Sequence, residues 1–163
     1  VSALVLFTSW RQLNAVISGL PKTLAEGLLV QGESSKQALL QEHRQRIDEG
    51  KSSYLFGVAS FSEGLDLPGE YCRHVVIVKL PFSVPDDPVD QAIAEWAEAQ
   101  GRNAFYEISV PDASLRLVQA CGRLIRSEKD YGTISMLDKR IVTQRYGRAL
   151  IESLPPFRLD LPA

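Results

Sequence analysis

The chain has 163 residues and a mass of 18.1 kDa, which is enough for one compact domain and too little for two full ones. Lys and Arg total 18 against 20 Asp and Glu, and this net charge of -2 excludes a histone-like protein or a polybasic membrane binder. Two cysteines and two histidines are too few for a disulfide framework or a four-thiolate metal site. We therefore expect a reduced, intracellular protein with no metal site in this chain. No apolar run approaches the roughly 20 residues that a membrane-spanning helix needs, so we expect no contact with a membrane.

The start of the chain is unusual, because it lacks Met and lies inside the apolar run Val1–Phe7. We expect a domain cut from a longer protein. Several short β-rich runs follow one another without the apolar and polar alternation of a sheet that has one wet face. Helical segments alternate with them, which predicts an α/β fold with a mainly parallel sheet covered by helices on both faces. The predicted strands are Leu4–Thr8, Leu28–Gln31, Tyr54–Ala59, Val75–Lys79 and Thr133–Leu137.

Capping patterns predict where the first two long helices begin. Ser9 to Gln12 and Ser34 to Gln37 both have capping-box spacing, and glycines mark the two helix ends. The segment 80–112 differs from the rest, since prolines surround one predicted helix there, and we expect an insertion or lid over the sheet of a single domain spanning 1–163. The remaining predicted helices are Asp90–Gln100, Ser114–Ser127 and Thr143–Ser153.

The segment Gln119 to Arg126, with the sequence QACGRLIR, carries the clearest chemical signal. On a helix, at about 100° per residue, Gln119, Arg123 and Arg126 fall within about 60° of one another. Guanidinium groups so placed match the oxygens of a polyphosphate and stay charged. Gly122 beside them lets a ligand approach the backbone closely. The pattern fits either a polyphosphate site or the solvated face of an amphipathic helix.

A second polar segment, Ser60–Gly69, directly follows the predicted strand that ends at residue 59. In an open parallel sheet, ligands bind beyond the carboxyl ends of the strands, where this loop is expected. Asp66 is suited to accept hydrogen bonds from a ribose, and Gly64 leaves room for the ribose. By itself, a loop rich in Gly and Asp is more often an ordinary turn.

Together, in this order and spacing, the two segments resemble motifs V and VI of superfamily 2 helicases, particularly the branch that contains XPD and the bacterial DinG and YoaA proteins. Ser62–Asp66, with the sequence SEGLD, matches motif V, and Gln119–Arg126 matches motif VI. The opening Phe7–Trp10 is similar to motif IV. The tripeptides at 130–132 and 138–140 also stand at the family's places. The resemblance covers nearly the whole chain.

The resemblance implies a RecA-like three-layer domain, the second of two motor domains that sandwich ATP. It implies that Arg123 and Arg126 reach the γ-phosphate and that Arg126 is the arginine finger. Such a finger is worth about 10³ to 10⁵ in rate in related phosphoryl-transfer enzymes. Asp66 would contact the ribose, and Gly64 would lie at the nucleotide edge of the loop.

The resemblance also implies a DNA side of the domain, to which Gln119 and Glu63 would couple the nucleotide state. Hydroxyl groups at strand ends and at a helix N-terminus suit phosphate oxygens, and an aromatic ring there can stack on a base. Two alternatives stay open, because the expected serine cap needs no phosphate and the tryptophan fits a core position equally well. The residues expected at DNA are Thr8, Ser9, Trp10 and Ser60.

The family's ATP and Mg²⁺ would be bound mainly by the first motor domain, because neither a Walker A loop nor a DEAH-type box occurs in this sequence. The chain alone is therefore expected to be inactive. A 4Fe-4S cluster, where family members carry one, would lie outside this chain. The implied partners are the first RecA-like domain, single-stranded or forked DNA, R-loops, single-strand DNA-binding protein and a clamp-loader subunit. The implied setting is DNA repair or replication in the bacterial cytoplasm at the nucleoid, with translocation from 5′ to 3′.

Two other functions stay open from the sequence. The chain fits a non-catalytic adaptor that keeps the RecA-like fold and uses its arginines to contact protein or nucleic acid. A nucleotide-sugar enzyme on a Rossmann-like sheet is a further alternative, but it would leave the arginine pair unexplained. A Gly-Lys-Thr/Ser loop upstream in the full-length protein would discriminate the motor from the adaptor.

Overall fold

The computed structural model describes residues 1–83 and 87–162. Its contacts divide the chain into two units, of which the first is formed by Val1–Lys79 and Ala120–Asp138. The second unit is formed by Leu80–Gln119 and Lys139–Ala163. The predicted lid at 80–112 within one domain stays a prediction, and Pro85, one of the prolines that frame it, lies outside the described residues.

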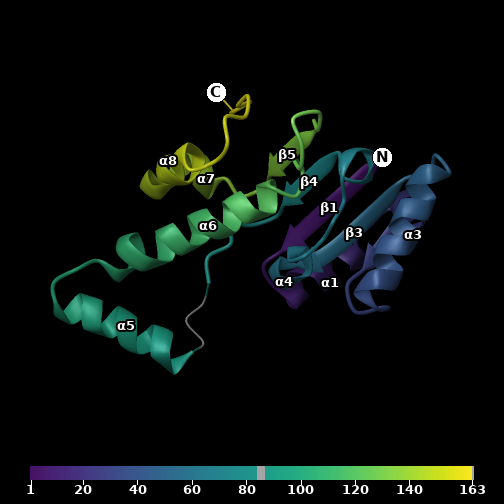
Figure 1. Cartoon of the computed structure of the whole chain (residues 1–163). Coiled ribbons are helices and arrows are strands. Elements are labelled where there is room, and N and C mark those ends of the chain that lie inside the picture. The colour runs from purple at the N-terminus through teal and green to yellow at the C-terminus, as the bar shows by residue number, and fades with distance from the viewer. Residues whose placement is uncertain (84–86, 163) are drawn as a thin grey trace. The chain divides into compact units, whose positions relative to one another are not determined.

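The first unit is built on a five-stranded sheet in which every strand pair is parallel (Figure 1). The strand order is β2-β3-β1-β4-β5, so β1 is central. Leu4, Leu55 and Val75 occupy neighbouring register positions on β1, β3 and β4 and are all 0% exposed, which explains why the strand runs lack alternation. The strands are β1 (Ser2–Phe7), β2 (Leu28–Val30), β3 (Ser53–Val58), β4 (His74–Ile77) and β5 (Thr133–Met136), and the predicted parallel sheet is confirmed.

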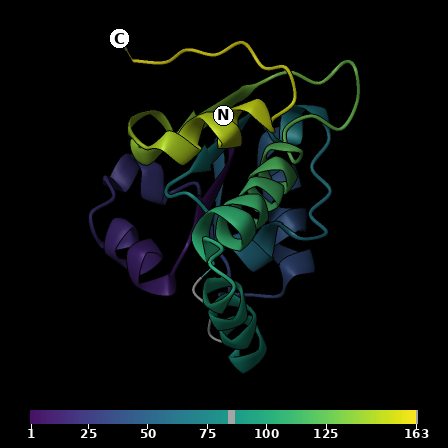
Figure 2. The same ribbon diagram turned by 90° about the vertical axis from the view of Figure 1, so that its left-hand side faces the viewer.

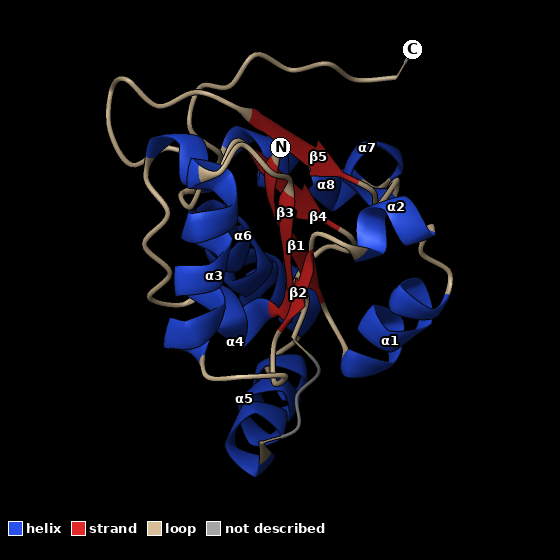
Figure 3. Ribbon diagram, turned by 90° about the vertical axis from the view of Figure 1, so that its right-hand side faces the viewer, coloured by secondary structure: helices blue, strands red, loops and turns tan. Residues whose placement is uncertain are grey.

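Helices cover both faces of this sheet, as predicted. Figure 3 shows α1 (Trp10–Ser18) and α2 (Lys22–Ala25) on one face and α3 (Lys36–Asp48) on the other. The α1 side buries a cluster formed by Phe7, Leu13, Val30 and Phe56. The three-layer α/β architecture is therefore confirmed.

Serine side chains cap the first two long helices. The Ser9 Oγ accepts a hydrogen bond from the Gln12 N–H at 3.2 Å, so the predicted cap of α1 is confirmed. The predicted cap of α3 is wrong by one residue, because Ser35 accepts from the Ala38 N–H at 3.2 Å. Ser35 is extended while Lys36 is already helical, and that geometry decides which of two adjacent serines is the cap.

The second unit contains α5 (Pro88–Ala99), the π-helical turn η2 (Phe105–Ser109) and most of α6 (Val110–Cys121). The predicted helix Thr143–Ser153 is wrong as one element. The structure has α7 (Arg140–Thr143) and α8 (Arg145–Glu152), which pack together, because Gln144 between them has an extended backbone (Figure 2). Within the described residues, none of the helices has both the length and the apolar character needed to cross a membrane.

Candidate functional site

The arginine-rich segment does not lie on a helix. Helix α6 ends at Cys121, and the N–H groups of Arg123 and Leu124 donate to the carbonyls three residues earlier, at 3.2 and 3.1 Å. The predicted helix Ser114–Ser127 is therefore wrong at its end, and Arg123 and Arg126 do not share a helix face with Gln119. Gly122 is the first residue past the helix, which is explained by the low helix propensity of glycine.

Asp130 shapes the loop that follows. Its Oδ2 accepts hydrogen bonds from the N–H groups of Arg126 at 2.8 Å and Ser127 at 2.7 Å. The Arg126 N–H lowers the pKa of the Asp130 carboxyl, and the N–H and hydroxyl of Ser127 and the N–H of Gly69 lower it further. A short polar side chain that bonds nearby N–H groups competes with helix, so Asp130 gives these two N–H groups partners outside a helix.

Arg123 ties this loop to the predicted nucleotide loop. Its Nη1 donates to the main-chain oxygen of Leu65 at 3.2 Å, and Arg123 is partly buried. The Arg123 Nε is buried and has no hydrogen-bond partner among the residues that the structure describes. The side chain of Leu65 is 1% exposed, so this contact is anchored in the core. Arg123 therefore joins two segments that lie 58 residues apart in the chain.

Arg126 lies at the surface beside Asp66. The distance from its Nη2 to the Asp66 Oδ1 is 3.5 Å, and the two side chains are 36% and 66% exposed. A guanidinium and a carboxylate at this separation and exposure are weakly held by each other, so both can rearrange toward a ligand. The structure thus brings together two predicted site residues, one with a phosphate-binding and one with a ribose-binding chemistry.

The predicted nucleotide loop runs from α4 (Ala59–Ser62) to the 3-10 turn η1 (Gly69–Tyr71). Gly64 has a φ of +68°, which strains any residue with a Cβ, and a Cβ built there would meet no atom within 4 Å. Glu63 is exposed, and its main-chain oxygen accepts a hydrogen bond from the Lys36 Nζ. Gly64 therefore serves the backbone conformation and leaves open space on its outer side.

The predicted DNA contacts gather at the carboxyl edge of the sheet. Phe7 pairs with Val58, so Thr8 and Ser9 after β1 lie beside the chain that leads to Ser60 after β3. All three side chains are exposed. A hydroxyl that accepts a hydrogen bond, as that of Ser9 does, still has its own hydrogen to donate to an anion.

Trp10 is the fourth predicted DNA contact, and it opens α1 at the same edge. Its side chain is 46% exposed and lies beside Gly32, where an added Cβ would be 3.9 Å from the ring. The alternative that Trp10 belongs to the core is therefore wrong. Gln119 is exposed and belongs to the second unit, and its coupling role stays a prediction.

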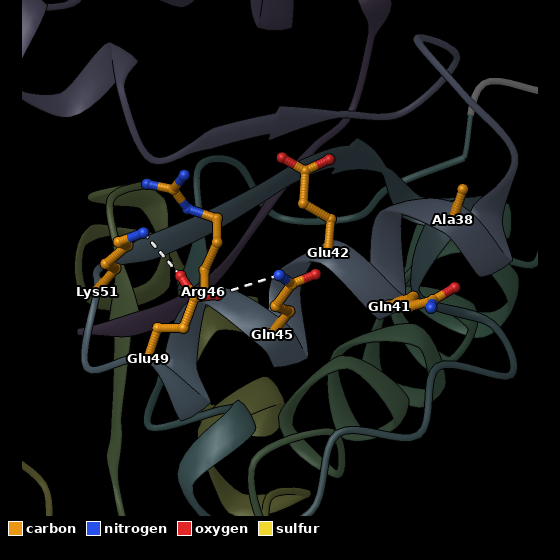
Figure 4. Close-up of a pocket in the computed structure, with 7 residues that line it drawn as sticks. All are labelled: Ala38, Gln41, Glu42, Gln45, Arg46, Glu49 and Lys51. Carbon is orange, nitrogen blue, oxygen red and sulfur yellow. Dashed lines mark hydrogen bonds and ion pairs between the residues drawn. The ribbon is translucent and has the colours of Figure 1, made fainter.

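A surface hollow on α3 has no counterpart among the predicted site residues. Figure 4 shows Lys51 and Gln45 directed at Glu49, with distances of 2.7 and 3.0 Å to its oxygens. Because these groups already satisfy one another, nothing in the hollow selects a ligand. Its lining residues are Ala38, Gln41, Glu42, Gln45, Arg46, Glu49 and Lys51.

Groups suited to metal or thiol chemistry are equally uninformative. Among the described residues, no three His, Cys, Asp or Glu side chains lie together so that they could hold a metal ion. Cys72 and Cys121 are buried free thiols, and burial raises the pKa of each to about 12. Neither cysteine is therefore poised as a nucleophile.

Sequence comparison finds a family match and close relatives. The family model described as helicase C-terminal domain matches residues 1–157. The chain is 50% identical over 160 residues to the ATP-dependent DNA helicase DinG of Photobacterium profundum, covering 96% of this chain and 23% of that protein. It is 40% identical to the Escherichia coli protein of the same name over 159 residues, covering 98% of this chain and 22% of that protein. The chain therefore spans about a quarter of the length of these relatives.

Solved structures share the fold. The structure named XPD_APO has a TM-score of 0.71 and 24% identity, over 93% of this chain and 30% of that one. The C-terminal domain of a DEAD-box protein has a TM-score of 0.50 and 16% identity, over 92% of this chain and 66% of that one. Both likenesses concern the fold, and they agree with the RecA-like architecture that the motifs imply.

Proposed function

Because the chain belongs to the helicase C-terminal domains of the DinG and XPD type, we propose that it is the second motor domain of an ATP-dependent DNA helicase. In this proposal the first motor domain, outside this chain, binds most of the ATP and its Mg²⁺. The second motor domain contributes an arginine finger, a ribose contact and a DNA-binding edge. The motor translocates from 5′ to 3′ on single-stranded or forked DNA.

The observation that carries the proposal is the pairing of Arg126 with Asp66. Residues 60 positions apart place a mobile cation and an exposed carboxylate 3.5 Å from each other. A nucleotide presents complementary groups, since its phosphates attract the guanidinium and its ribose hydroxyls donate to a carboxylate. Arg123 is bonded to Leu65 and partly buried, so Arg126 is the residue with freedom to reach across a closing cleft.

In the proposed cycle, ATP binding closes the two motor domains on each other. Arg126 leaves Asp66 and meets the charge that develops on the γ-phosphoryl group, while Arg123 keeps the two loops together. Hydrolysis removes that attraction and the cleft reopens. Thr8, Ser9 and Ser60 hold a DNA phosphate through this movement, and Trp10 stacks on a base.

The first experiment measures ATP hydrolysis by the full-length protein with and without single-stranded DNA. Arg126→Ala should lower the DNA-stimulated kcat by about 10³-fold or more. Arg158→Ala, an exposed arginine near the C-terminus, removes the same charge and should leave the rate unchanged. Circular dichroism and DNA binding should match the wild type for both variants.

Either of two results would contradict the motor. One is a wild-type protein without DNA-dependent turnover, and the other is turnover that ignores Arg126. The adaptor alternative would then take its place, with the arginines serving as contacts to protein or nucleic acid.

The DNA edge is tested separately, by the affinity of the full-length protein for a fluorescent single strand. Trp10→Ala should weaken binding by about 1 to 3 kcal/mol, the range for loss of one stacked base. The matched control is Trp96→Ala, which removes the other tryptophan, 58% exposed on α5. Equal losses for the two variants would overturn the assignment of Trp10.

A further inference from the structure

Helix α3 holds the nucleotide loop at both ends and in the middle. At the start of the loop the Lys36 Nζ donates to the Glu63 main-chain oxygen. At the far end the His43 Nε2 donates to the Tyr71 main-chain oxygen at 2.7 Å, and the Tyr71 hydroxyl donates to the Asp48 Oδ1 at 2.8 Å. The loop between these contacts consists of turns and extended backbone, so its shape depends on α3.

The middle contact belongs to Arg44. Its Nη2 donates to the main-chain oxygen of Asp66, and its guanidinium carbon lies 5.8 Å from the centre of the Tyr71 ring. The Arg44 Nε is buried without a hydrogen-bond partner in the described part of the chain, so the group is held by these two contacts rather than by water. Arg44 therefore fixes the peptide group of Asp66 while the Asp66 carboxylate stays 66% exposed.

We propose that Arg44 is a positioning residue for nucleotide binding, which holds the Asp66 peptide group so that the Asp66 carboxylate meets a ribose hydroxyl of ATP. The proposal rests on the proposed function, because it assumes that Asp66 contacts the ribose. A guanidinium on the Asp66 carbonyl limits rotation of that residue's backbone and so narrows the directions that its side chain can take. Pre-ordering a contact in this way lowers the cost of binding.

The consequence is a specific dependence on the sugar. When a site is built to accept a hydrogen bond from a hydroxyl, an analogue that lacks that hydroxyl binds more weakly. Loss of Arg44 should therefore erode the preference for ATP over its 2′-deoxy or 3′-deoxy analogue, whichever lacks the contacted hydroxyl. General damage to the fold would weaken all three nucleotides alike and leave that preference intact.

The experiment measures kcat and KM of DNA-stimulated hydrolysis by the full-length protein for ATP, 2′-deoxy-ATP and 3′-deoxy-ATP. Arg44→Ala should raise the KM for ATP about two- to tenfold, the range for one lost hydrogen bond, and bring the KM ratio of ATP to one deoxy analogue toward unity. The kcat should change less than the KM. Arg44→Lys, which keeps one cationic donor, should restore part of the preference.

A matched control lies on the same helix. The Arg46 Nε donates to the Ser52 main-chain oxygen at 3.2 Å, so Arg46→Ala removes the same charge from α3 without touching the nucleotide loop (Figure 4). The combined variant Arg44→Ala with Asp66→Ala should be no worse in KM than Asp66→Ala alone, because both act through one contact.

Failure of the proposal can be told from failure of the proposed function. If Asp66→Ala erodes the sugar preference and Arg44→Ala does not, the positioning role is overturned while the motor stands. If Arg44→Ala lowers kcat alone, or acts like Arg46→Ala, the positioning role is likewise overturned. If the full-length protein shows no DNA-stimulated hydrolysis, the proposed function itself fails.

Discussion

At the scale of single residues, the loop after α6 depends on one carboxylate. Asp130 accepts hydrogen bonds from two consecutive N–H groups, and one of them belongs to Arg126. Arg126 therefore has a fixed main chain and a free side chain, which suits a group that must reach a ligand repeatedly. Neither the arginine spacing nor the capping patterns reveal this support, although DYG at 130–132 is one of the family's tripeptides.

Replacing Asp130 by alanine should lower the DNA-stimulated kcat of the full-length protein severalfold, with only a small change in melting temperature. Two N–H groups lose their acceptor, but water can replace it at this exposed place, so the order of the loop suffers more than the stability of the fold. Steady-state hydrolysis and thermal unfolding measure the two effects. Asp160→Ala is the control, and a kcat like that of the control would rule out the role of Asp130.

At the scale of elements, a buried histidine joins α3, β3 and η1. His43 is 0% exposed, and its Nε2 faces the carbonyl of Tyr71, which can only accept, so that nitrogen carries the hydrogen. The Nδ1 then accepts from the Ser53 hydroxyl at 2.8 Å. Burial is the main cause that lowers the pKa of His43 below 6.5, and Arg44 nearby lowers it further, whereas the Tyr71 carbonyl raises it.

The stability of this region should therefore fall under mildly acidic conditions. An unfolded His43 binds a proton as the pH drops through about 6.5, but the folded state does so only at lower pH, so the free energy of unfolding decreases over that interval. Hydrogen exchange of peptides covering α3 and β3 in the full-length protein should accelerate between pH 7 and pH 5, after correction for intrinsic rates. His43→Gln cannot titrate and should flatten this trend, and an unchanged trend would refute the assignment.

The contact between β4 and the loop before β5 depends on the absence of a side chain. A Cβ at Gly132 would overlap the main-chain oxygen of Arg73 and meet the side chain of Leu124. Gly132→Ala should destabilise the first unit by about 1 to 3 kcal/mol, as overpacking does, because backbone atoms cannot move aside. Thermal unfolding of the full-length protein measures the loss. Gly101→Ala would strain a positive φ but meet no atom, so it is the comparison for strain without a clash.

At the scale of the whole molecule, the chain carries half of a proposed catalytic centre. It supplies exposed Arg126 and Asp66 but contains no phosphate-binding loop of the Walker type. The chain produced alone should show no ATP hydrolysis, while the full-length protein should hydrolyse ATP. A release of phosphate by the chain alone that disappears in Arg126→Ala would contradict this division of labour.

Much of this molecule follows from local sequence. Buried strand runs alternating with helices determine the parallel sheet, because only a fold with both sheet faces covered hides such runs from water. The motif residues Ser62–Asp66 and Gln119–Arg126 pointed to the family that the comparisons show. The capping serine of α1 was also predictable, since its hydrogen bond spans three residues.

Only the tertiary structure decided how the candidate site is assembled. The helix that the arginines were expected to share ends at Cys121, because Gly122 and Asp130 offer the backbone another course. The contacts of Arg123 with Leu65 and of Arg126 with Asp66 join segments about 60 residues apart, and the hold of Arg44 on Asp66 spans 22. Propensity and periodicity report on neighbours within a few residues, whereas such contacts depend on how the sheet and α3 pack.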